Sequence, residues 1–120
     1  MSAIQDSLNE LRRAPGVKAC LLVTFDGLVV AESVGNKFRD DIIAGLASYL
    51  VMTTNKALGD GGLPAFDTFT VHAAHGKAVL IDVAGSILAV LLDQFADLEA
   101  SRSEIQGTAQ RLRRSAKLGS

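Results

Sequence analysis

Apolar and polar residues alternate along the first third of this 120-residue chain with the period of a β-strand. Val17, Ala19, Leu21, Val23 and Phe25 occupy every second position. Asp26-Gly27 follows, a dipeptide typical of tight hairpin turns, and a second apolar run covers residues 28–34. This second run is apolar on both faces near its start, as in sheets that are covered on both sides. Residues 17–34 therefore predict a β-hairpin inside a layered domain.

Three more strands are predicted in the second half of the chain, at residues 66–74, 77–84 and 87–93. His75-Gly76 and Gly85-Ser86 are the only breaks between them. Connections this short join antiparallel neighbours, so the three strands predict a meander. Hairpin and meander together predict one five-stranded antiparallel sheet, since sequential strands are usually adjacent.

Helical spacing of apolar residues marks three other segments. A first helix ends at Pro15-Gly16, a long helix covers residues 38–58 with Gly59 as its stop, and a last helix carries Leu98, Ile105 and Leu112 on one face. The element order is α-ββ-α-βββ-α. We therefore expect a single domain, residues 1–120, of the α/β (α+β) class, with three layers in the order α/β/α.

The long helix is apolar over more than the stripe of about 100° that one buried face needs. One face holds Ile42, Leu46, Tyr49, Leu50, Thr53 and Ala57, and Ile43, Ala47, Val51 and Leu58 widen it. A helix of this kind has to bury itself against two surfaces. One is its own sheet, and we expect the other to belong to a second subunit.

The composition of the chain excludes some classes of function but does not indicate a specific one. Hydrophobic residues make up 48% of the chain and aromatic residues 5%, so the core is aliphatic. The net charge of −1 gives no general attraction to nucleic acid or membranes. Residues 102–120 hold five basic residues and one acidic residue, a local charge of +4, which is typical of a solvated helix end and less often of an interaction tail. Apolar runs are too short to cross a bilayer, and no signal peptide is recognisable, so we expect a cytoplasmic protein without membrane insertion.

No set of residues predicts catalysis, a metal or a cofactor. The glycines at 59–62 follow a helix and lack the Lys-Ser/Thr pair of a phosphate-binding loop. His72 and His75 lack metal-site spacing, and Cys20 has no evident base and reads as a small core residue. Asp82, inside an apolar run, is expected at an exposed or edge position. We therefore expect a binding protein and no enzyme.

The hairpin phrase Phe25-Asp26-Gly27-Leu28-Val29-Val30-Ala31 resembles the Roadblock/LC7 domain, whose hairpin ends in a similar Asp-Gly-Leu-x-x-Ala phrase. The run at 86–92, followed by residues 97–102, resembles the last strand of that family and the start of its last helix. The element order matches over nearly the whole chain. The resemblance implies the Roadblock or profilin-like fold, of the bacterial type with GTPase-activating members.

The resemblance also implies a homodimer in which the third strands pair and the long helices pack together. Carried onto this chain, it assigns these residues to the dimer interface: Ile43, Ala47, Leu50, Val51, Thr54, Leu58, Phe66, Thr68, Phe69, Thr70, Val71 and His72.

Family members scaffold or regulate small Ras-like GTPases, some as GTPase-activating proteins, so the resemblance implies such a partner here. The outward or polar candidates for its contact on the long helix are Arg39, Ser48, Met52, Asn55 and Lys56. The alternative is a profilin-like small-molecule sensor of the PAS or GAF type, which needs inward aromatic or polar groups around a ligand pocket. Five Phe and one Tyr leave little material for that pocket.

Overall fold

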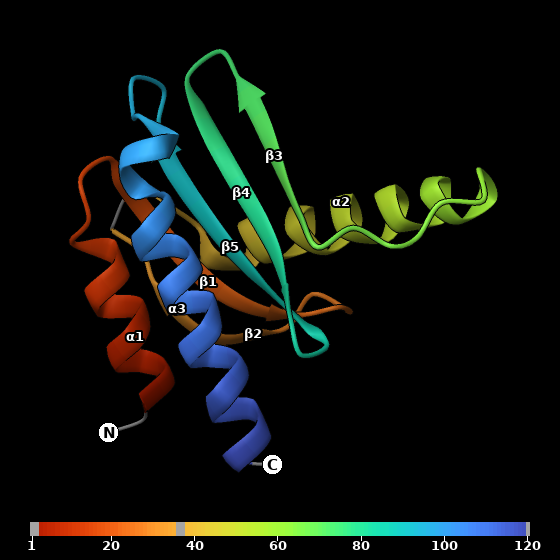
Figure 1. The fold of residues 1–120 in the computed structure, drawn as a ribbon. Coiled ribbons are helices and arrows are strands. Elements are labelled where there is room, and N and C mark those ends of the chain that lie inside the picture. Colours follow the sequence, from red (N-terminus) through yellow and green to blue (C-terminus); the bar gives the residue numbers. More distant parts are fainter. Residues whose placement is uncertain (1–2, 36–37, 120) are drawn as a thin grey trace.

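The computed structural model describes residues 3–35 and 38–119 and contains three helices and five strands within them (Figure 1). Short polar or glycine-containing segments separate the elements, as the sequence pattern predicts. In chain order the elements are α1 (Ala3–Arg12), β1 (Val17–Thr24), β2 (Val29–Ser33), α2 (Asp40–Asp60), β3 (Thr68–Ala73), β4 (Gly76–Val83), β5 (Ser86–Asp93) and α3 (Leu98–Gly119).

The strands form one antiparallel sheet in the order β2-β1-β5-β4-β3. The hairpin joins the meander through β1 and β5, where Cys20 lies opposite Val90 and Leu22 opposite Leu88. β2 and β3 are consequently the two edge strands. A register shift between Leu22 and Val23 marks a bulge opposite β2.

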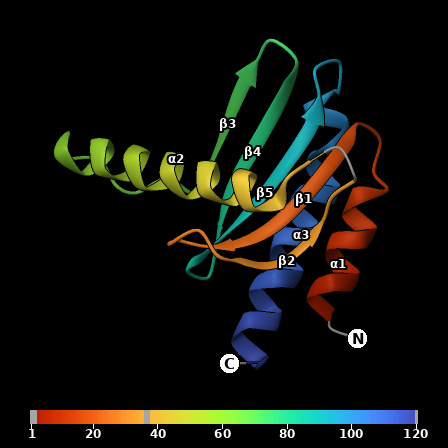
Figure 2. The same cartoon turned by 180° about the vertical axis from the view of Figure 1, so that it is seen from behind.

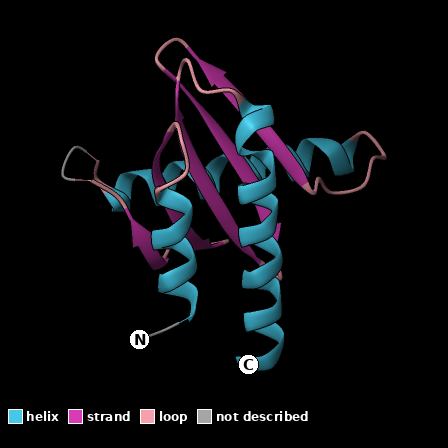
Figure 3. Ribbon diagram, turned by 60° about the vertical axis from the view of Figure 1, so that its left-hand side comes forward, coloured by secondary structure: helices cyan, strands magenta, loops and turns pink. Residues whose placement is uncertain are grey.

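Two helices cover one face of the sheet and the third covers the other. α1 and α3 lie side by side in front of the sheet in Figure 1, and α2 crosses the opposite face, which is in front in Figure 2. In Figure 3 the helices next to the N and C labels, α1 and α3, lie in front of the sheet and α2 passes behind it. This is the predicted α/β/α arrangement with the predicted element order.

Each sheet face has its own core because β1 and β5 alternate apolar side chains between them. Against α1 and α3 the buried set is Leu8, Leu11, Val17, Cys20, Leu22, Val79, Ile81, Val83, Leu88, Val90, Leu92, Ile105, Ala109 and Leu112. Against α2 it is smaller: Leu21, Val23, Ala44, Ala47, Val51, Leu80, Ile87 and Ala89. The strand predicted to be covered on both faces, residues 28–34, is instead the edge strand β2, where Val30 is 50% exposed, and the strands buried on both faces are β1 and β5. The predicted core position of Cys20 is confirmed.

Some predicted boundaries are wrong by about two residues. α2 begins at Asp40 and ends at Asp60, because Gly61 closes the last turn with its N–H on the carbonyls of Ala57 and Leu58. β3 begins at Thr68 and not at Phe66. Before it, the N–H of Phe66 donates to the side-chain oxygen of Asn55 on α2, at 3.1 Å, so this residue is tied to the helix and not to the neighbouring strand.

Candidate interaction surfaces

α2 packs against the sheet through the side that carries its small residues, and its large apolar residues lie on the exposed side. Its buried residues are Ala44, Ala47, Ser48 and Val51, one stripe at helical spacing that permits a close approach to β1 and β5. The other side of the helix exposes Ile42 by 53%, Leu46 by 59%, Tyr49 by 67% and Met52 by 59%. We call these four residues the α2 stripe. Apolar residues gathered in this way mark an interaction surface.

The interface residues that the sequence analysis assigned to α2 therefore need a correction. Ala47 and Val51 are 4% and 3% exposed within the single chain, so a partner helix cannot reach them without unpacking the core. Ile43, Leu50, Thr54 and Leu58 are half-buried and remain partly accessible. The exposed Ile42, Leu46 and Tyr49 were absent from the predicted interface. The signal that could have found them is residue size, since the smallest apolar residues face the sheet.

Two of the five predicted partner contacts do not point outward. Ser48 is buried, and its hydroxyl donates to the carbonyl oxygen of Phe25 in the β1–β2 turn. Asn55 is half-buried and accepts the N–H of Phe66. Both side chains hold neighbouring segments against α2. Met52 and Lys56 are exposed, and Lys56 makes an ion pair of 3.0 Å with Asp60 one turn later.

The fifth predicted contact, Arg39, lies exposed at the residue that precedes the first turn of α2. Its guanidinium donates to the carboxylate of Asp41 at 3.2 Å. This hydrogen bond holds the pKa of Asp41 below its ordinary value. Asp40 and Asp41 also lie in the first helical turn, where the helix dipole favours negative charge. This end of the helix therefore presents charge next to the apolar stripe.

β3 is the open edge of the sheet. Its residues pair with β4 from Thr68 opposite Ile81 to Ala73 opposite Gly76, and with no other strand of the described residues. Thr68, Thr70 and His72 are exposed and alternate with the half-buried Phe69 and Val71. An edge of this kind offers unpaired backbone groups to a further strand. Phe66 and Phe69 stack edge to face at 4.5 Å on the side of α2.

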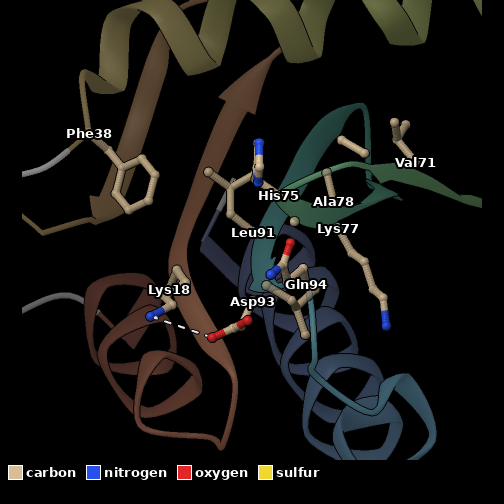
Figure 4. Close-up of a pocket in the computed structure, with 12 residues that line it drawn as sticks. Lys18, Phe38, Val71, His75, Lys77, Ala78, Leu91, Asp93 and Gln94 are labelled. Atoms are coloured by element: carbon tan, nitrogen blue, oxygen red, sulfur yellow. Dashed lines mark ion pairs between the residues drawn. The ribbon is translucent and has the colours of Figure 1, made fainter.

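α2 covers only part of the sheet face that it crosses, and the uncovered part contains a hollow of about 450 Å³ (Figure 4). Its floor is apolar, with Val71, Ala78 and Leu91 from three neighbouring strands, and Phe38 lies at its side. Polar groups surround it, including an ion pair of 3.8 Å between Lys18 and Asp93. The far ends of β3, β4 and β5 lie on one side of α2 in Figure 2, and the tip of the β1–β2 hairpin lies on the other.

The described residues include no group of three or more His, Cys, Asp and Glu residues that could hold a metal ion. Burial raises the pKa of the Cys20 thiol to about 12, and the thiol donates to the carbonyl of Leu8 at 3.1 Å. Asp82 was expected at an exposed or edge position; it lies on β4, an inner strand, so the edge alternative is wrong, and its side chain is half-buried. Its carboxylate accepts the N–H of Gly85 in the β4–β5 turn.

None of the described helices combines the length and the hydrophobicity that a membrane crossing requires.

Comparisons with known proteins agree with this fold. The profile of the Roadblock/LC7 domain matches residues 3–93. An uncharacterized protein of Methanocaldococcus jannaschii is 28% identical over 112 residues, which cover 93% of this chain and 95% of that protein. The structure is similar to a Roadblock/LC7 domain from Streptomyces avermitilis, with a TM-score of 0.82, 25% identity and coverage of 97% and 99%. It is also similar to Myxococcus xanthus MglB, with a TM-score of 0.90, 17% identity and coverage of 98% and 97%.

Proposed function

Because this chain belongs to the Roadblock/LC7 domain family, we propose that it is a non-enzymatic homodimeric platform in the cytoplasm that regulates or scaffolds a small Ras-like GTPase. The observation that carries the proposal is the α2 stripe, a row of large exposed apolar residues on a helix whose opposite side is already buried. Exposed apolar residues in such a row do not stabilise the single chain, but a protein partner could bury them.

The open edge of β3 supports the pairing of two copies. Two β3 strands that run antiparallel across a two-fold axis would continue the sheet and satisfy the edge of both chains. α2 reaches past β3 in Figures 1 and 3, so in such a pair its C-terminal half would extend over the partner copy.

The hollow of Figure 4 is the apolar surface that a partner helix would cover. Helical periodicity puts Ile43, Leu50 and Thr54 on one flank of α2 and Met52 on the opposite flank. Ser48 binds the hairpin tip on the flank of Met52, so the flank of Ile43 and Leu50 faces the hollow. The second helix of a dimer would then lie along that flank, with the α2 stripes of both copies still outside.

The stripes of the two copies would form one continuous apolar surface, and we assign the GTPase to it. The family resemblance implies regulation through the switch segments of the GTPase, for which the platform needs to supply contacts and no catalytic group. Either tethering or stimulation of hydrolysis is compatible with this surface. A small-molecule sensor has less support, because the hollow of Figure 4 is open and apolar and has few polar groups that converge on its floor.

Two measurements test this proposal. Light scattering on the purified protein is expected to give twice the 12.6 kDa of the chain. Ras-like GTPases from the same genome are then titrated, loaded with GDP or with a GTP analogue, and GTP hydrolysis is followed with and without this protein. Binding to one nucleotide state supports the proposal, and a rate increase identifies an activator. A monomer that binds no GTPase in either state would refute it.

A further inference from the structure

A second hollow, of about 420 Å³, lies between the tip of the β1–β2 hairpin and α2. Phe25 and Asp26 line it from the turn, and Val51, Met52 and Asn55 line it from the helix. Val51 is 3% exposed, whereas Phe25 and Met52 are 39% and 59% exposed and offer their apolar surfaces to a ligand. We call this site the Phe25–Met52 hollow. It adjoins the α2 stripe, to which Met52 also belongs.

The two sides of this hollow are fixed to each other in the free protein. The hydroxyl of Ser48 donates to the carbonyl oxygen of Phe25, which ties the turn to the helix. Gly27 permits the shape of this turn because its φ is +93°, a conformation that residues with a side chain rarely adopt, and it lies in ordinary van der Waals range of Ser48 and Gly45. A site that is ordered before binding loses less entropy when its ligand arrives. The flexible thioether of Met52 can still adapt to the shape of that ligand.

The charge at the edge of the hollow indicates which charged group of a partner would lie beside the apolar side chain that enters it. The Asp26 carboxylate accepts the Thr24 hydroxyl and makes no ion pair within the part of the chain that the structure describes. On the neighbouring turns of α2, Lys56 and Asp60 form an ion pair of 3.0 Å with each other, so their charges cancel. Asp26 therefore leaves one negative charge at this edge, and an adjacent cation on a partner would be attracted to it.

We propose that the Phe25–Met52 hollow is an anchor site for the protein partner and takes a large apolar side chain with a lysine or arginine next to it. This inference rests on the proposed function and deepens it, because it names the side chains by which the partner would engage the platform. The site lies on the flank of α2 opposite to Ile43 and Leu50, so pairing of two copies through that other flank leaves it open. Anchors of this kind supply much of the energy of protein interfaces.

The first test needs no partner protein. The peptide N-acetyl-Leu-Arg-amide is titrated into the protein while NMR follows the ε-methyl group of Met52, which is one of only two methionines in the chain. A saturable shift is expected, with affinity for N-acetyl-Leu-Glu-amide about threefold weaker, the effect of one exposed ion pair. The Phe25→Ala variant should lose the shift. A shift that does not saturate, or that is equal for both peptides, overturns the inference.

The second test uses the GTPase and a matched control. Phe25→Ala and Met52→Ala are expected to weaken its binding about thirtyfold each, as for interface anchors. Phe95→Ala is the control, because Phe95 is 85% exposed and follows β5 at the other end of the sheet from the hairpin tip. Equal losses in all three variants, or none in Phe25→Ala, refute the anchor site while the proposed function stands. If the wild-type protein binds no GTPase, the proposed function fails and the peptide titration alone decides the inference.

Discussion

Ser48 is the residue that joins the long helix to the β1–β2 turn. It is buried, and its hydroxyl satisfies the carbonyl of Phe25 at a point where no strand partner reaches. Ser48→Ala should therefore lower the free energy of unfolding by about 1 kcal/mol, the net value of such a hydrogen bond. Urea denaturation measures this change. Ser103→Ala, on the exposed side of α3, is the matched control and should change stability by less than about 0.5 kcal/mol. Similar losses in both variants would contradict the role given to Ser48.

Cys20 gives a prediction on pH. Burial is the main reason that its thiol pKa is raised from 9.0 to about 12 in the folded protein. The unfolded chain then loses this proton first, so the group destabilises the fold as pH rises from 9 toward 12 and has no effect below. Denaturation midpoints of the wild type and Cys20→Ala across this range measure the difference between them. The wild type should show the steeper alkaline decline, and parallel curves would exclude Cys20 as its source.

A thiol reagent supplies an independent check on the same residue. Only the thiolate reacts, and Cys20 is 0% exposed, so labelling near neutral pH should proceed in urea and be far slower in buffer.

Single residues also show where the sequence was insufficient. Ser48 and Asn55 are polar, and polarity alone predicted that they face solvent. The structure instead pairs them with the backbone of Phe25 and Phe66, two segments far away in the chain. Such partners follow from tertiary packing and leave no periodic trace in the sequence. Cys20 was predictable, because it lies in the continuous apolar run of residues 19–23, all of which are buried.

At the scale of elements, every helix and strand was predictable from apolar periodicity and turn residues, while the faces of α2 were not. When a helix is apolar nearly all round, the apolar pattern does not indicate which side of the helix packs against the sheet. Side-chain size resolves it, since Ala44, Ala47 and Ser48 permit the close approach that Tyr49 and Leu46 would prevent. The ends of α2 and β3 differ from the predicted ends because the backbone N–H groups of Gly61 and Phe66 donate hydrogen bonds to the helix.

The two edge strands allow a paired test of dimerisation. Val71→Lys places a charge on β3 and on the apolar floor of the hollow in Figure 4, where the partner helix would lie. It should shift the light-scattering mass toward a monomer, because burying an unpaired ammonium group is costly. Val30→Lys is the control on β2, where the side chain is already 50% exposed. Circular dichroism verifies that both variants fold. A dimer that tolerates Val71→Lys would contradict the proposed pairing.

At the scale of the whole molecule, short connections predicted one sheet, but they did not reveal that β1 joins β5. That contact places β3 at an edge and α2 across the centre of one face. Small-angle scattering can then distinguish one copy from two. The single chain has a radius of gyration of 13.6 Å over its Cα atoms, and a compact pair would have about 18 Å or more. A radius that stays near the single-chain value at every concentration would argue against pairing.

The opposite edge of the sheet has a consequence for how far association can proceed. β2 is a short strand next to a bulge, α1 packs beside it, and the side chain of Gln5 already donates to the carbonyl of Glu32 at 2.9 Å. These are devices by which proteins blunt an edge. A sheet with one protected edge can add a further strand only at its other edge. A two-fold contact between two such edges uses the open edge of both copies. A chain that pairs through β3 in the proposed way would therefore stop at two copies and could not extend into a fibre through its strands.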